Sequence, residues 1–108
     1  MVEVIWTKLS TNQLERAVKY IQKEQGTFYA ELVLTKILDS VVRLEHHPKI
    51  GQIEPLLKHK KNEYRYIIVW SYKIIYRVGL QKVVISRVFH TSQKPSKIFS
   101  TIRTKKKR

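Results

Sequence analysis

The residues of this chain that could take part in chemistry are mostly cations, and several lie in one alternating stretch near the C-terminus. Residues 71–90 read SYKIIYRVGLQKVVISRVFH, so lysine and arginine alternate with apolar side chains up to a final histidine. Alternate residues of a strand share a face, which places Lys73 and Arg77 together, away from the neighbouring tyrosines. Arg65 in the preceding strand and Arg87 in the following one could flank them, depending on the register of the sheet.

A strip of cations on a rigid sheet suits the recognition of phosphate or carboxylate groups, and arginine does so especially well through its planar fork. The alternative is that ordinary solvated lysines and arginines cover the outer face of a half-buried sheet. The residues expected to bind an anionic partner are Arg65, Lys73, Arg77, Arg87 and Lys94.

His90 ends the last expected strand and is the candidate for acid–base chemistry. A histidine near arginines is a reasonable general acid or base for attack by an RNA 2′-hydroxyl, and the cations would stabilise the transition state. The alternative is a structural histidine that bonds to loop backbone. If the protein cleaves RNA, the candidate catalytic residues are Arg65, Lys73, Arg77 and His90.

Thiol and metal chemistry are not expected. The chain has no cysteine, which excludes disulfides, zinc-thiolate sites and thiol catalysis. His46 and His47 are adjacent and would point in opposite directions in an extended segment, and the acidic residues form no carboxylate pair for a two-metal nuclease. Any phosphodiester chemistry would have to be metal-free, and no cofactor is expected.

The charge balance indicates an anionic partner. Lysine and arginine number 22 against 8 acidic residues, for a net charge of +14. This favours nucleic acid, an acidic protein or an anionic membrane surface, whereas the alternative is that scattered lysines only keep the protein soluble. The sequence contains neither a signal-peptide pattern nor an apolar run of membrane-spanning length, so we expect a cytoplasmic protein with no membrane partner.

The elements that would position these residues begin with a strand and a helix. The alternation over residues 2–7 predicts a short strand. Ser10 is expected to cap the first helix, with Gln13 completing a capping box, and Gly26 is expected to end it.

A second helix is expected from Thr27, which could cap it, to a stop before Pro48. One face of this helix carries apolar residues at helical spacing: Ala30, Val33, Leu34, Ile37, Leu38, Val41 and Leu44. Residues 48–62 are predicted to form a loop with at most one short ordered piece. Strands rich in β-branched and aromatic residues are predicted over residues 64–70, 72–78 and 82–89.

This order predicts an α+β fold with an N-terminal strand, an antiparallel helical hairpin and a three-stranded antiparallel meander, abbreviated βααβββ. The hairpin would cover one face of the sheet and leave the other partly open for a ligand. We expect one domain over residues 1–99 and a basic, flexible tail over residues 100–108.

Three segments carry recurring motifs. Residues 44–51, LEHHPKIG, fit L-x-x-x-P-x-x-G, and residues 64–78, YRYIIVWSYKIIYRV, fit R-x-x-x-x-x-x-Y-R-I-x-Y-x-V except at Lys73. Residues 83–90, VVISRVFH, are similar to an ending I-x-x-V-x-H. In this order, and over residues 5–95, the chain resembles the RelE/ParE-type toxins of bacterial type II toxin–antitoxin modules, most closely the ParE-like branch.

The resemblance implies a toxin that inhibits growth, a behaviour associated with plasmid stabilisation. A cognate acidic antitoxin would neutralise it within a toxin–antitoxin hetero-oligomer. ParE-like members inhibit DNA gyrase, whereas RelE-like members cut mRNA on the ribosome.

In the RelE-like branch, Lys73 would stand where an arginine is usual and His90 near a catalytic histidine. Lysine replaces a bidentate fork with a point charge, and Lys94 follows a short polar segment where a basic cluster is usual. The extended hairpin and the V-F-H ending favour the ParE-like branch, and with it gyrase as the target. An mRNA endoribonuclease and a non-catalytic basic nucleic-acid-binding module are the alternatives.

Overall fold

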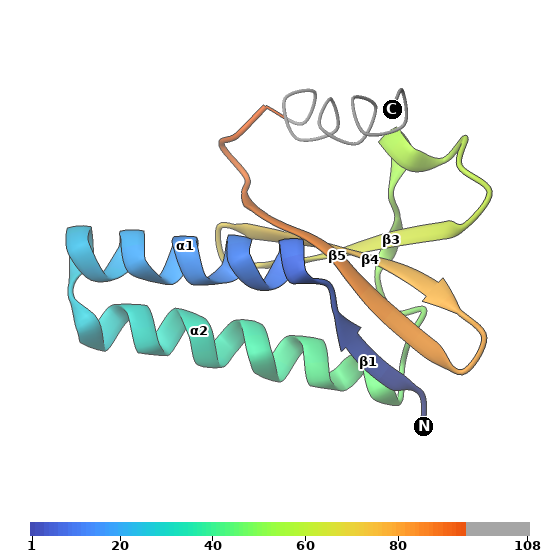
Figure 1. Cartoon of the computed structure of the whole chain (residues 1–108), viewed down its shortest axis with the longest axis horizontal. Coiled ribbons are helices and arrows are strands. Elements are labelled where there is room, and N and C mark those ends of the chain that lie inside the picture. Colours follow the sequence, from blue (N-terminus) through green and yellow to red (C-terminus); the bar gives the residue numbers. More distant parts are fainter. Residues whose placement is uncertain (95–108) are drawn as a thin grey trace.

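The computed structural model of the chain describes residues 1–94, in which two antiparallel helices lie against a five-stranded sheet (Figure 1). The elements, in chain order, are β1 (Glu3–Trp6), α1 (Lys8–Gln25), α2 (Thr27–Val42), η1 (Arg43–Glu45), β2 (Gln52–Ile53), η2 (Pro55–Leu57), β3 (Glu63–Val69), β4 (Tyr72–Gly79) and β5 (Lys82–His90). The α+β prediction is confirmed. The predicted tail, and the last residues of the predicted domain, lie outside the described residues.

The helix α1 begins three residues earlier than the capping box predicts. Its N-cap is Thr7, whose side chain accepts a hydrogen bond from the backbone N–H of Ser10 at 3.0 Å. The hydroxyl of Ser10 is buried and donates back to the carbonyl of Thr7 at 2.9 Å. The prediction of Ser10 as the cap is therefore wrong, and Gln13 instead accepts a hydrogen bond from the backbone N–H of Val88 in β5.

Gly26 alone joins the two helices. Its φ of +95° lies in the region that favours glycine, which explains why the chain can reverse direction in a single residue. Thr27 is the first residue of α2 rather than its cap. The N-cap is Gly26, and no side chain makes a capping hydrogen bond at that end. The last turn, η1, ends at Glu45, ahead of Pro48 as predicted.

The sheet has the order β1-β5-β4-β3-β2. The strands β3, β4 and β5 form the predicted antiparallel meander, and β1 adds to β5 in parallel. The segment predicted as a loop supplies the short edge strand β2, which pairs with β3 through Gln52–Tyr66 and Ile53–Arg65.

A bulge in β5 changes which residues face the helices. Tyr76 of β4 lies opposite Ile85, whereas Ile75 lies opposite Arg87, so Ser86 is an extra residue on β5. As a result Ile85 and Val88 both pack in the core beneath the helices, although strict alternation would separate them.

The main core lies between the helices and one face of the sheet, which we call the helix face. Its most deeply buried side chains are Ile37, Leu44, Ile74, Tyr76, Val83 and Ile85. A second cluster forms on the opposite face, where Leu57 of η2 covers Ile75 and Phe89. The face that the sequence analysis leaves partly open is therefore covered at its centre, because η2 packs over it. No helix among residues 1–94 is long and apolar enough to cross a membrane.

Candidate functional site

The strand pairing divides the predicted cations between the two faces of the sheet. Arg65 lies opposite Tyr76, so it belongs to the helix face, whereas Arg77 lies opposite Tyr64 on the other face. Residues directly opposite one another in an antiparallel pair share a face, which puts Lys73 with Arg77 and leaves Arg65 apart. Arg65 therefore does not flank the other two.

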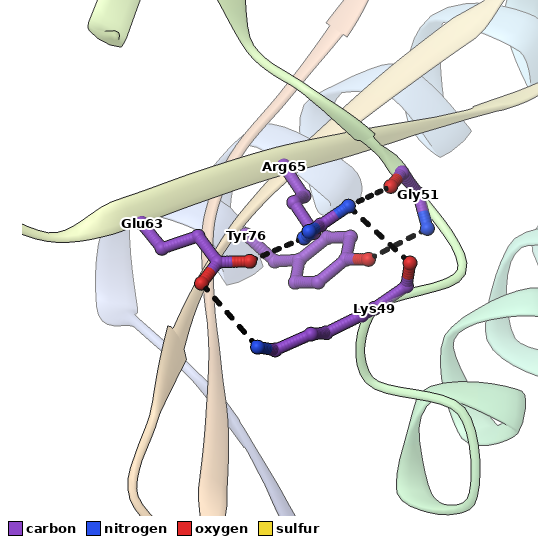
Figure 2. A network of polar contacts seen from close by, with 5 residues as sticks. All are labelled: Lys49, Gly51, Glu63, Arg65 and Tyr76. Atoms are coloured by element: carbon purple, nitrogen blue, oxygen red, sulfur yellow. Dashed lines mark hydrogen bonds and ion pairs between the residues drawn. The ribbon is translucent and has the colours of Figure 1, made fainter.

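Arg65 holds the segment that connects the helices to the sheet (Figure 2). One of its terminal nitrogens, Nη1, donates to the carbonyl of Gly51 at 2.7 Å and to the carbonyl of Lys49 at 3.3 Å. Its Nε pairs with the carboxylate of Glu63, which also contacts the ammonium of Lys49 at 3.8 Å. Arg65 is thus committed to internal contacts.

Tyr76 completes this network from β4, because its hydroxyl accepts a hydrogen bond from the N–H of Gly51 at 3.0 Å (Figure 2). Burial raises the pKa of Tyr76, although that hydrogen bond and the charge of Arg65 act in the opposite direction. A Cβ at position 51 would lie 2.5 Å from the carbonyl oxygen of Tyr66 and 2.7 Å from the Tyr76 hydroxyl. The glycine of the L-x-x-x-P-x-x-G motif is therefore required by close packing.

Lys73 is also engaged within the protein. Its ammonium lies 2.6 Å from Oε1 of Glu54, whose side chain is fully buried, and 4.2 Å from the centre of the Tyr66 ring. The second carboxylate oxygen of Glu54 accepts from the N–H of Leu56 at 3.0 Å and so caps η2. Lys73 thus anchors η2 against the sheet. Clamping a phosphate would require it to leave a buried carboxylate.

Arg77 and Arg87 remain available on the same face as Lys73. The side chain of Arg77 has no hydrogen bond or ion pair with any residue among 1–94. Within residues 1–94, the Arg87 side chain donates only to the backbone carbonyl of Ser86, from Nη1 at 2.8 Å. Burial lowers the pKa of Arg87, while the nearby phenol of Tyr64 raises it. We call the surface formed by Tyr64, Arg77 and Arg87 the cationic face.

A shallow hollow of about 230 Å³ extends the cationic face toward the loop before β3. Its lining combines three lysines with one acidic residue, and consists of Ile53, Leu57, Lys58, Lys60, Lys61, Asn62, Glu63 and Tyr64. Sequence analysis did not select these lysines, although the run KHKK at positions 58–61 is visible in the sequence. The pairing of β3 with β4 places Tyr64 beside Arg77, so this hollow adjoins the cationic face.

His90 lies on the helix face, away from the cationic face. Its ring meets the buried ring of Tyr72 edge-on at 5.3 Å, and its Nδ1 accepts a hydrogen bond from the N–H of Ser92 at 3.0 Å. The sheet therefore separates His90 from Arg77 and Arg87, and the four candidate catalytic residues do not come together. Lys94 follows on an exposed stretch beyond the strand.

His90 opens onto a groove between α1 and the end of β5, which we call the β5 groove. Its volume is about 600 Å³, and its polar lining comes from Gln13, Arg16, Tyr20, Tyr72, His90, Ser92 and Gln93. Burial raises the pKa of Tyr72, and the phenols of Tyr20 and Tyr29 add to that effect.

Trp70 is an exposed aromatic residue at the end of β3, where aromatic side chains are more often buried. It stands in the tight turn between β3 and β4 with φ +55°, a backbone conformation that costs a bulky residue energy. Its ring stacks on Tyr29 of α2 at 5.8 Å and is 46% exposed. The chain thus keeps an aromatic residue where glycine would be less strained. Trp70 and Tyr29 line a smaller hollow of about 80 Å³, which shares Tyr20, Tyr72 and His90 with the β5 groove.

Comparisons with known proteins bear on the family and on the fold of this chain. The family model described as the ParE toxin of the type II toxin–antitoxin system ParDE matches residues 4–95. A solved structure described as a chromosomal ParDE toxin–antitoxin system from P. aeruginosa has a similar fold, with a TM-score of 0.70 and 18% identity. That alignment covers 83% of this chain and 96% of the other. No curated protein sequence matches significantly.

Proposed function

Because this chain belongs to the ParE toxin family of type II toxin–antitoxin systems, we propose that its target is DNA gyrase and that it acts by binding rather than by catalysis. The chain is the toxin of such a module, and its partner is an antitoxin with which it forms a hetero-complex. The cationic face and Lys94 are the surfaces we assign to anionic partners.

The separation of the candidate catalytic residues carries this proposal. General acid–base cleavage of RNA needs the base and the cations that stabilise the transition state within reach of one phosphodiester. Arg65 is held by Glu63 and Gly51, Lys73 is held by Glu54, and His90 lies across the sheet from Arg77. Binding a protein target needs no such convergence.

The charge of the molecule supports an acidic antitoxin. The net charge of +14 favours encounter with an acidic partner, and arginines that lack internal partners can offer both donors to a carboxylate. Arg77 meets that condition among residues 1–94, and Arg87 meets it in part.

A supercoiling assay with purified gyrase tests the target. We expect the full chain to block supercoiling and to accumulate cleaved DNA, and we expect prior addition of the antitoxin to restore activity. In cells, expression of the toxin alone should arrest growth and induce the DNA-damage response. Growth arrest with normal supercoiling at every toxin concentration would exclude gyrase.

Ribosome-dependent mRNA cleavage is the second candidate, because Tyr64, Arg77 and Arg87 place a phenol and two cations on one face. Mapping mRNA ends after induction distinguishes it, since gyrase inhibition produces no new codon-specific ends. If such ends appear, the Arg77→Ala variant should lose them. Undiminished cleavage in a His90→Ala variant would remove His90 from the mechanism.

A further inference from the structure

The edge of β5 is open over its last residues. The parallel partner β1 pairs with residues 82–85 only, and Thr7 then closes the ladder by donating to the carbonyl of Ile85. From there the chain turns into α1. On this side, residues 88–90 have no neighbouring strand among the described residues.

The two backbone amides that point out of this edge are held by glutamine side chains. The N–H of Val88 donates to Oε1 of Gln13 at 2.8 Å, and the N–H of His90 donates to Oε1 of Gln93 at 3.0 Å. Phe89, between them, pairs inward with β4. Outward and inward amides thus alternate along residues 88–90, as they do in any edge strand that can pair with an added strand.

The carbonyl of Val88 lies between these donors and has no hydrogen-bond partner within residues 1–94. The side chains of Gln13 and Gln93 thus accept the hydrogen bonds that a neighbouring strand would accept. Unlike a backbone strand, these side chains can rotate away without any unfolding of the sheet or of α1. An exposed edge that is covered in this way is protected against uncontrolled pairing and still remains accessible.

The β5 groove runs along this edge and provides room for a chain. Its volume of about 600 Å³ is bounded by α1 on one side and by the backbone of residues 88–90 on the other. The groove carries Arg16 and His90, and Lys94 follows at its end, whereas no acidic residue lines it among residues 1–94. Its charge therefore suits an acidic occupant.

We propose that the edge of β5 at residues 88–90 accepts an extended acidic segment of the antitoxin as an additional strand, with Gln13 and Gln93 rotating aside to release the two amides. Main-chain hydrogen bonds give such strand addition its affinity, and the groove walls select the side chains. The inference rests on the antitoxin partnership described above and specifies where, and by which atoms, part of that partner binds.

Amide hydrogen exchange tests the release of these two donors. The double variant Gln13→Ala/Gln93→Ala of the full chain should expose the amides of Val88 and His90. Binding of the antitoxin encoded by the adjacent reading frame should then slow the exchange of both amides by at least roughly tenfold. Gln52→Ala, which removes an exposed glutamine from the far edge strand, is the matched control and should leave both amides unchanged.

The outcomes separate the strand addition from the wider proposal. A stable complex in which both amides still exchange rapidly would disprove strand addition and leave the antitoxin partnership intact. Amides that stay slow in the unbound double variant would mean that another part of the same chain covers the edge, which also disproves it. Failure to form any complex would overturn both.

A variant that keeps the hydrogen bond provides a second test that does not depend on exposing the edge. In Gln13→Glu the carboxylate holds the Val88 amide more strongly and repels an acidic strand. We expect its affinity for the antitoxin to fall by roughly tenfold, whereas Gln52→Glu, which adds the same charge at the far edge, should change it by less than about twofold. Equal affinities for the two variants would contradict the inference.

Discussion

Single residues explain two of the motifs in structural rather than catalytic terms. Arg65 and Tyr76, which the sequence presents as part of a cationic and aromatic strand motif, both bind Gly51 of the preceding motif. The two motifs are therefore parts of one contact, in which Gly51 of the first binds Arg65 and Tyr76 of the second. The sequence shows the motif residues but not which of them are in contact. Those contacts follow from the register of β2, β3 and β4 in the sheet.

The tightest of these contacts predicts the effect of Gly51→Ala. A methyl group at this position would overlap the backbone oxygen of Tyr66, which pairing in the sheet holds in place. We expect a loss of unfolding free energy of about 2 kcal/mol or more, measured by urea denaturation. Gly79→Ala is the control, because there the nearest atom belongs to the flexible side chain of Lys82, at 3.2 Å. Equal losses for the two variants would contradict the explanation.

Lys73 provides a second prediction at this scale. Replacement by methionine leaves the fully buried carboxylate of Glu54 without its ammonium partner, and we expect a loss of about 3 kcal/mol of unfolding free energy. The double variant Lys73→Met/Glu54→Gln removes the charge as well and should recover most of that stability in the same denaturation experiment. If the double variant is no more stable than Lys73→Met, the ion pair does not hold η2.

At the scale of elements, the sequence predicts the helices and the meander because each has its own periodicity. It does not predict that Ser86 forms a bulge, since a one-residue insertion into the ladder leaves the pattern of apolar residues ambiguous. Nor does it place β1 beside β5, because a four-residue strand carries no sign of its partner. The bulge decides that His90 faces the helices, because without the extra residue His90 would lie opposite Ser71 rather than Tyr72. The sequence therefore identifies the candidate residues by their type, but it does not predict which of them lie on the same face of the sheet.

The helix caps in the structure differ from those that the sequence pattern predicts, and this difference can be tested by mutation. Thr7 caps α1 through its side chain, whereas Thr27 makes no capping bond at the start of α2. Thr7→Ala should therefore cost about 1 kcal/mol of unfolding free energy, and Thr27→Ala should cost only a few tenths. Thermal or urea unfolding monitored by circular dichroism measures both. The reverse order would show that α2 is the helix with the side-chain cap.

At the scale of the whole molecule, the two faces of the sheet have different chemical character. The helix face carries the main core, and the β5 groove at its margin is lined by tyrosines, glutamines and His90. The opposite face combines a small core with Arg77 and Arg87, which pair with no carboxylate among residues 1–94. One acidic partner long enough to cover both surfaces would bury the open strand edge and neutralise the free arginines together.

This division predicts how antitoxin binding responds to charge and salt. Arg77→Ala/Arg87→Ala should slow association on the order of tenfold at low ionic strength, because long-range attraction governs encounter more than complex lifetime. Stopped-flow mixing at increasing salt should find the variant and the unmodified chain converging as the charges are screened. Lys8→Ala/Lys36→Ala removes the same charge from exposed positions on the two helices and is the control. If this control slows association equally, attraction depends on net charge alone, and the cationic face has no special part in recognising the antitoxin.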